Sequence, residues 1–205
     1  AMTNDHAIQP SEPLPSAAYT VLSPRKVLAS GLTRGPWDPQ HQHAGPPIAM
    51  MCRAIEAVAR DHGLTQIGRI TANLLRPVPI AELEIEVDTD YAGRNAAHYS
   101  ARLLGGGKEL ARFTALAQRE SEIVLPADLD GHPLPLAPKT PADSAEQRMP
   151  FGRRLPGYAD LVENRIASGK FFAGRCAAWF KLQRPLVEGE DASGYQRVAV
   201  AADSG

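Results

Sequence analysis

Residues 46–63, PPIAMMCRAIEAVARDHG, form the stretch that decides the fold. The two leading prolines suit the first turn of a helix, where backbone amides have no intrahelical partner, and Gly63 suits its end. Between them most side chains are apolar, and the polar Arg53, Glu56 and Arg60 recur at spacings of three and four to form one narrow stripe. The pattern predicts a helix of about four turns that must be enclosed on nearly all sides.

Segments with β-type patterns stand on both sides of this helix. They are residues 19–22, 26–28, 67–75, 81–91, 96–104 and 109–118. In the fourth of these, Leu83, Ile85 and Val87 alternate with acidic residues, which is typical of a strand with one buried face. The connections are short and rich in proline or glycine, so neighbouring strands must be antiparallel. We predict an α+β fold in which one antiparallel sheet wraps around one central helix.

The composition divides the chain into four parts. We expect a loose N-terminal tail at residues 1–16, a first structured unit at 17–120, a Pro-rich linker at 121–150 and a second unit at 151–205. The second unit repeats the order strand, loop and apolar helix, with the strand at 176–182 and the helix opening at 195–202. Such a helix needs a covering sheet, so we interpret residues 151–205 as the beginning of an incomplete second copy of the first unit.

Charge and composition exclude several partner classes. The 205 residues are 43% hydrophobic and 22% charged, with a formal net charge of -1 and the two signs intermixed. We therefore expect no nucleic-acid partner and no membrane partner. Two cysteines far apart in the sequence indicate reduced thiols, and no signal or membrane-spanning pattern occurs. These features favour a cytoplasmic protein.

The loop and the helix together resemble a known family. The loop at 40–47, QHQHAGPP, followed by an Ala/Met-rich helix, is similar to the His-Gly-Gly-type loop of the acyl-CoA thioesterase II (TesB-like) double-hotdog family. Residues 71–79, TANLLRPVP, resemble that family's second strand, and residues 179–203 resemble the start of its second hotdog. The resemblance covers most of residues 19–205. It implies a hotdog fold with the start of a second hotdog unit, and hydrolysis of fatty acyl-CoA thioesters by direct water attack, without a cofactor. The sequence departs from the family because most of the second hotdog is absent.

The loop before the helix offers half of such a site. Thioester hydrolysis needs donors that stabilise charge on the carbonyl oxygen, and a helix N-terminus supplies free amides and a positive dipole end. The prolines remove two donors, which leaves the amides of His43, Ala44 and Gly45. Gly45 would let a substrate approach the backbone closely. The alternative is that Gly45 serves only the turn into a crowded helix.

Asp203 is the candidate for the other half. By resemblance it matches the family's catalytic aspartate, which positions the attacking water together with a Thr and a Gln. Those two partners would fall after Gly205. The alternative is that Asp203 is a polar residue in a turn with Ser204.

Further contacts follow from the loop and the helix. His41 and His43 form a His-x-His pair that could offer two metal ligands, but no third ligand stands at a suitable spacing, so we expect no metal. We expect one histidine to contact the substrate or cap the helix and the other to be exposed. If the acyl chain lies along the central helix, Met50 and Met51 contact it, and His41 and Ala44 complete the binding residues.

The sequence thus predicts an acyl-CoA thioesterase. A non-catalytic acyl-CoA or acyl-chain binding module is the alternative, and a hotdog dehydratase is a third reading that needs a histidine such as His43 facing an acid across a dimer. No Gly-x-Ser-x-Gly elbow occurs, which weighs against a serine hydrolase. Because half of a double hotdog would expose apolar surface, we expect a homo-oligomer.

Overall fold

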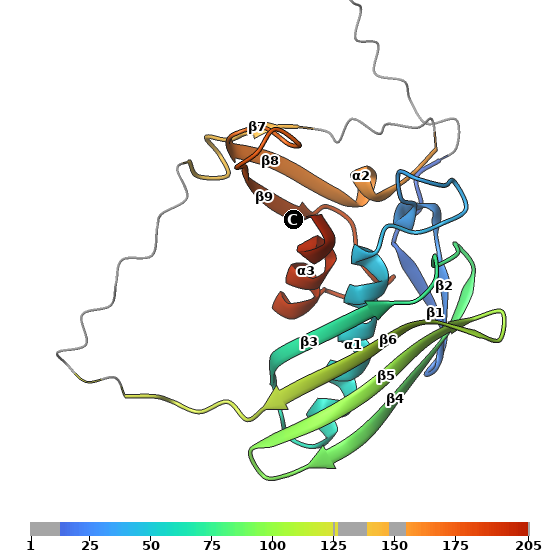
Figure 1. The fold of residues 1–205 in the computed structure, drawn as a ribbon, viewed down its shortest axis with the longest axis vertical. Coiled ribbons are helices and arrows are strands. Elements are labelled where there is room, and N and C mark those ends of the chain that lie inside the picture. Colours follow the sequence, from blue (N-terminus) through green and yellow to red (C-terminus); the bar gives the residue numbers. More distant parts are fainter. Residues whose placement is uncertain (1–12, 125, 127–138, 148–154, 205) are drawn as a thin grey trace, which may run out of the picture.

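The structure of the chain is a computed structural model that describes residues 13–124, 126, 139–147 and 155–204. Its larger sheet has six strands in the order β1-β2-β4-β5-β6-β3, and each neighbouring pair is antiparallel (Figure 1). The strands are β1 (Tyr19–Ser23), β2 (Lys26–Ala29), β3 (Gln66–Leu74), β4 (Glu82–Ala92), β5 (Ala96–Gly105) and β6 (Lys108–Gln118).

The strands form where the sequence alternates. In β4, Leu83 and Ile85 are buried, whereas Glu82 and Glu84 are exposed on the outer face. β5 and β6 are joined by a tight turn in which Gly106 and Gly107 both have positive φ, a conformation that glycine adopts without strain. The predicted antiparallel sheet is therefore confirmed.

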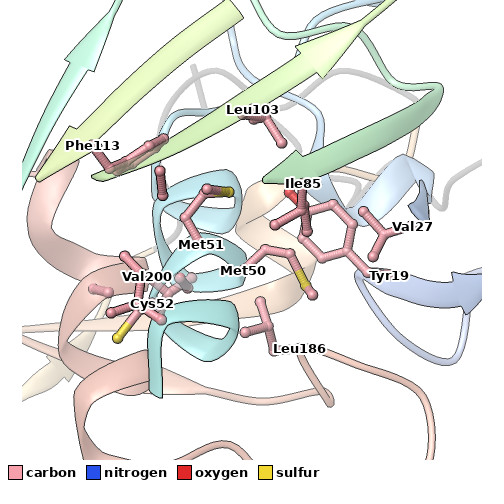
Figure 2. Packing of buried hydrophobic residues seen from close by; sticks show 14 of the residues in the cluster. Tyr19, Val27, Met50, Met51, Cys52, Ile85, Leu103, Phe113, Leu186 and Val200 are labelled. Carbon is pink, nitrogen blue, oxygen red and sulfur yellow. The ribbon is translucent and has the colours of Figure 1, made fainter. Parts of the chain in front are cut away.

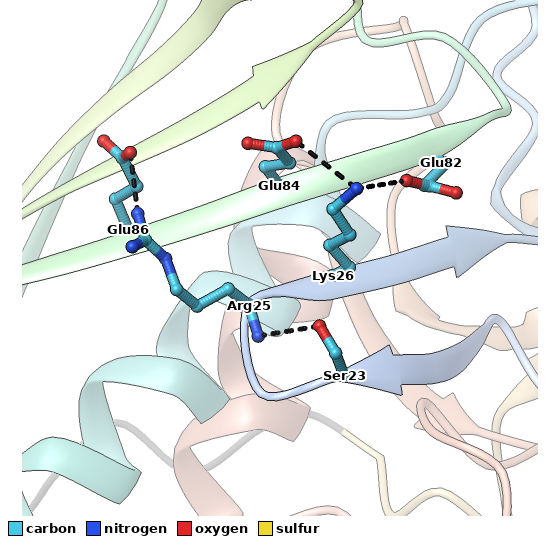
Figure 3. Close-up of polar contacts among 6 residues, drawn as sticks. All are labelled: Ser23, Arg25, Lys26, Glu82, Glu84 and Glu86. Atoms are coloured by element: carbon cyan, nitrogen blue, oxygen red, sulfur yellow. Dashed lines mark hydrogen bonds and ion pairs between the residues drawn. The ribbon is translucent and has the colours of Figure 1, made fainter.

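Ion pairs on the outer face of the sheet link the β1–β2 hairpin to the neighbouring strand β4. The Lys26 ammonium lies 3.0 Å from a carboxylate oxygen of Glu82 and 3.6 Å from one of Glu84, and Arg25 contacts Glu86 at 2.7 Å (Figure 3). These pairs are largely exposed, and exposed pairs contribute at most about 1 kcal/mol each. They help to fix the register of the hairpin, but the core supplies most of the stability.

The predicted central helix is α1 (Gly45–Asp61), whose C-cap residue is His62, followed by Gly63 at a φ of 69°. One side of α1 packs on the six-stranded sheet, and the other side packs on α3 (Gly194–Ala201) (Figures 1 and 2). Both sides of the helix are therefore covered, as its apolar surface requires. Burying one large apolar side chain in this way contributes about 1.5–3 kcal/mol.

The second part of the chain forms a smaller sheet in the order β7-β8-β9. Its elements are β7 (Ala145–Glu146), α2 (Tyr158–Leu161), β8 (Val162–Ser168), β9 (Ala177–Leu182), α3 and the 3₁₀ turn η2 (Ala202–Ser204). The segment between β9 and α3 runs parallel to β1, where Tyr19 donates its amide to Leu186 O at 2.9 Å and Glu188 donates to Tyr19 O at 3.0 Å. One hydrophobic cluster includes residues from both parts.

The strand at 176–182 and the helix at 195–202 are confirmed within one or two residues as β9 and α3. Two strands were not predicted: β8, and the two-residue β7, which lies inside the expected linker. Most of the expected tail at 1–16 lies outside the described residues, but Leu14 packs against the core. Among the helices of the described residues, none is long and apolar enough to cross a membrane.

Candidate functional site

The loop before α1 is held on both sides by backbone hydrogen bonds. His43 donates its amide to Thr33 O at 2.7 Å, and Gln42 donates to Val78 O at 2.8 Å. The side chain of Gln42 adds a bond from its amide nitrogen to Pro79 O at 2.7 Å and accepts one from Tyr19 Oη at 2.5 Å. These bonds fix the direction in which the His43 side chain leaves the loop.

Both nitrogens of the His43 ring face polar groups. The amide of Gly45 donates to Nδ1 at 3.1 Å, and Nε2 lies 3.6 Å from Oδ2 of Asp203. Because Nδ1 accepts a hydrogen bond, the neutral ring carries its proton on Nε2, which points to the carboxylate. Burial holds the pKa of His43 below its ordinary value, and the Asp203 carboxylate opposes this effect in part. The His43 side chain is 12% exposed and the Asp203 side chain 41%.

Asp203 reaches His43 because α3 ends beside the start of α1. Asp203 belongs to η2, directly after α3, and the backbone oxygen of Val200 occupies the space that a side chain at Gly45 would need. A Cβ at Gly45 would lie well under 3.0 Å from that oxygen. The glycine is therefore needed for the approach of two helices, which agrees with the alternative that it serves a crowded helix start. The expectation that its missing Cβ admits the substrate is corrected.

A third side chain, Tyr158 of α2, joins the two groups. Its ring stacks on the His43 ring with centroids 3.8 Å apart and an interplanar angle of 8°. Its hydroxyl donates to Val200 O at 2.9 Å and lies 3.1 Å from Oγ of Ser204. Burial raises the pKa of the Tyr158 hydroxyl to about 12, so the hydroxyl stays protonated at neutral pH. Tyr158 thus contacts both halves of the predicted site.

These residues lie at a cavity of about 890 Å³, which is large enough for a small ligand. The side chains around it are largely apolar and include several aromatic rings. Among the residues that line it are His43, Ala44, Tyr158, Phe180 and Asp203.

Only one of the three predicted loop amides is available. The His43 amide bonds to Thr33, and the Gly45 amide bonds to the His43 ring. The amide of Ala44 has no hydrogen-bond partner within the described part of the chain, and Ala44 lines the cavity. The prediction of three donors is therefore corrected to one.

Three other predicted residues lie away from the cavity. His41 pairs with Asp38 at 3.6 Å, outside the cavity lining. Met50 and Met51 are 1% and 0% exposed because they fill the space between α1 and the sheet (Figure 2). Neither methionine lines the cavity at His43, although Met50 borders a second, smaller cavity of about 430 Å³ along α1, so the expectation that they contact an acyl chain along the helix stays a prediction. In the described ranges, no group of three or more His, Cys, Asp or Glu side chains is placed to hold a metal.

The sequence did not indicate Tyr158 as a site residue. It follows Pro156 and Gly157 next to a Pro-rich region, where no periodicity predicts a helix. The signal that could have found the element is the spacing of Gly157 and Asp160, because the Asp160 carboxylate accepts the Gly157 amide at 3.0 Å and caps the short helix.

Comparison with solved structures identifies the architecture. A conserved protein of unknown function with a hotdog fold from Alicyclobacillus acidocaldarius matches with a TM-score of 0.64 at 17% identity, over 93% of this chain and 67% of its own. This chain has a hotdog fold. A protein assigned as a thioesterase from Novosphingobium aromaticivorans matches with a TM-score of 0.63 at 16% identity, over 91% of this chain and 71% of its own. The tesB protein of Mycobacterium avium subsp. paratuberculosis matches with a TM-score of 0.63 at 14% identity, over 92% of this chain and 66% of its own.

A family model adds information about the part of the chain that contains α1 and strands β3 to β6. Residues 33–118 match the acyl-CoA thioesterase N-terminal domain. The matched range runs from the loop before α1 to the end of β6, so it includes His43, Ala44 and Gly45. The match supports thioesterase activity in general. No curated protein matches the chain, and the chain spans about two thirds of the length of the solved structures described above.

Proposed function

We propose that this hotdog protein hydrolyses fatty acyl-CoA thioesters by direct attack of water, with Asp203 as the base. The observation that carries the proposal is the approach of Asp203 Oδ2 to His43 Nε2, 3.6 Å, in the lining of a largely apolar cavity beside the N-terminus of α1. A carboxylate, an imidazole and a helix N-terminus around one cavity supply the groups that thioester hydrolysis needs.

The start of α1 is the part that polarises the thioester carbonyl. The Ala44 amide can donate to the carbonyl oxygen, and the positive end of the α1 dipole favours the negative charge that develops there. Because only one amide is available as a donor, the helix dipole supplies much of the stabilisation of the negative charge on the carbonyl oxygen. The apolar lining of the cavity would hold the acyl chain next to this point.

Asp203 is the part that activates water. Its carboxylate removes a proton as the water oxygen bonds to the carbonyl carbon, and the carbon–sulfur bond then breaks. The proton held by Asp203 passes to the departing sulfur, so the products are a carboxylic acid and free CoA thiol. The Nε2–H of neutral His43 faces the carboxylate and keeps it turned toward the cavity.

The variant Asp203→Asn tests the proposal. It keeps the size of the side chain but removes the base, so release of free thiol from acyl-CoA should fall by at least ~100-fold, the contribution expected of a general base. Binding of a non-hydrolysable acyl-CoA analogue should remain. Thiol release is followed with a colorimetric thiol reagent across short, medium and long acyl chains.

Asp38→Asn is the matched control. Asp38 also lies 3.6 Å from a histidine, His41, but this pair is outside the cavity, so its loss should leave thiol release unchanged. Undiminished turnover by Asp203→Asn would remove Asp203 from the mechanism. If the chain binds acyl-CoA but releases no thiol, it is a binding module, and hydration of an enoyl-CoA would favour dehydratase chemistry.

A further inference from the structure

Tyr158 lies beside the His43–Asp203 pair and contacts the His43 ring as well as α3 and η2, the elements that place Asp203. It is 5% exposed, belongs to α2 and lies far from His43 in the sequence. Its ring covers one face of the His43 imidazole at 3.8 Å, nearly parallel to it. An aromatic ring in this position fixes the tilt of the imidazole and keeps water from that face.

The hydroxyl of Tyr158 contacts the end of α3 and the η2 turn that carries Asp203. It donates to Val200 O, close to the end of α3, and lies 3.1 Å from Ser204 Oγ in the turn that contains Asp203. A carbonyl near a helix end has no intrahelical partner of its own, so this bond gives it one. The turn is therefore tied to the same side chain that orients His43.

Tyr158 is itself fixed by its backbone. Its amide donates to Arg34 O at 2.9 Å, and the Arg34 guanidinium bonds back to Pro156 O. Arg34 precedes the loop that carries His43, so the two segments are linked at two points. The backbone of Tyr158 is thus held by contacts that do not involve Asp203.

We propose that Tyr158 is a positioning residue that holds the His43 ring in the orientation in which Nε2 faces Asp203, and holds the η2 turn in place to receive it. The inference rests on the proposed hydrolytic role of Asp203. Within it, Tyr158 touches no substrate atom that reacts and acts through His43 and Asp203.

The proposal predicts a link between Tyr158 and the protonation of His43. Asp203 of η2 faces the imidazole directly, Tyr158 covers it from α2, and Arg34 and Asp160 line the same cavity. Burial under the Tyr158 ring lowers the pKa of His43, so the neutral ring persists to lower pH than its ordinary value of about 6.5 allows. Without the ring, water reaches the imidazole and its pKa should rise toward that value.

Two variants of the 205-residue chain distinguish the role of the Tyr158 ring from the role of its hydroxyl. In Tyr158→Leu the His43 titration midpoint, followed by NMR of the ring protons, should move to higher pH. The acidic limb of the pH profile of thiol release should move to higher pH by the same amount. In Tyr158→Phe the midpoint should stay, but hydrogen exchange of the Ala202 amide, which donates to Ala199 O, should accelerate at least several-fold. Thiol release at the pH optimum should fall by roughly tenfold, about 1.4 kcal/mol.

His62 serves as the internal control, because it caps the C-terminal end of α1 and lies 2.8 Å from the Tyr99 hydroxyl, so its ring-proton signals should be the same in all variants. An unchanged His43 midpoint in Tyr158→Leu would overturn the ring's role, and unchanged Ala202 exchange in Tyr158→Phe would overturn the hydroxyl's role. The isosteric Phe variant keeps the test valid if the Leu variant fails to fold. If the NMR effects occur but the unmodified chain releases no thiol, the proposed function fails and the positioning role stands.

Discussion

Gly45 decides how closely α1 and α3 approach. A Cβ on Gly45 would overlap the backbone oxygen of Val200, which cannot turn aside as a flexible side chain can. We predict that Gly45→Ala lowers the free energy of unfolding by about 1–3 kcal/mol, the range for overpacked sites. This loss exceeds the gain of at most about 1 kcal/mol that alanine brings to a helix. Urea unfolding of the two proteins measures the difference.

Gly194→Ala is the matched control for this substitution. Gly194 begins α3 as Gly45 begins α1, but a Cβ there meets nothing within 4 Å. Its replacement should leave the free energy of unfolding unchanged or raise it by up to about 1 kcal/mol. If both alanine variants prove equally stable, the helix contact at Gly45 is less tight than the structure indicates.

Single site residues could be predicted from the sequence, but their contacts could not. The loop pattern indicated His43, and the family resemblance indicated Asp203. The expectation that one histidine caps the helix agrees with the bond from the Gly45 amide to the His43 ring. Nothing in the pattern told that the His43 amide is also bonded, because its acceptor, Thr33 O, is placed by the fold. Tyr158 was missed for the same reason, since its role depends on two neighbours distant in the sequence.

At the scale of elements, Glu56 couples α1 to α3. It is 6% exposed, and its Oε2 accepts from Ser193 Oγ at 3.0 Å and from Gln196 Nε2 at 2.7 Å. Glu56→Ala leaves the buried Gln196 amide and the partly buried Ser193 hydroxyl without this acceptor, and a buried unsatisfied group costs about 1–3 kcal/mol. We predict a loss of about 1–3 kcal/mol in unfolding free energy, measured by urea denaturation.

A double-mutant cycle isolates this contact from general effects of the substitution. Glu56→Ala combined with Gln196→Ala removes donor and acceptor together, so the pair should be destabilised by less than the sum of the two single changes. Strictly additive losses would show that the two helices pack without help from this carboxylate.

Elements were predictable where periodicity is strong. The Leu83, Ile85 and Val87 alternation predicts β4, and the encircling apolar surface predicts α1. By contrast, β8 buries the polar Asn164 where the alternation calls for an apolar residue, so its sequence reads as irregular. A two-residue strand such as β7 carries no periodic signal at all. Such elements form because neighbouring strands offer hydrogen bonds, which a local pattern does not encode.

At the scale of the whole molecule, one core holds both parts of the chain together. Leu186 and Val200 belong to the same buried cluster as Met50 of α1 and Tyr19 of β1 (Figure 2). Because the two sheets share this cluster and the backbone bonds between β1 and residues 185–188, neither part can lose its packing without exposing apolar surface on the other. This arrangement predicts cooperative unfolding.

The test uses one reporter in each part of the chain. Trp179 lies in β9, and Trp37→Phe leaves it as the single tryptophan, so its fluorescence follows the smaller sheet, while far-UV circular dichroism follows mainly the larger one. We predict coincident urea transitions. Leu186→Ala, at a site 1% exposed, should destabilise the chain by about 2–5 kcal/mol and move both transitions together. Separate midpoints, or a shift seen by fluorescence alone, would show two independently folding parts, and the contact between Asp203 and His43 would then depend on their docking and not on a common core.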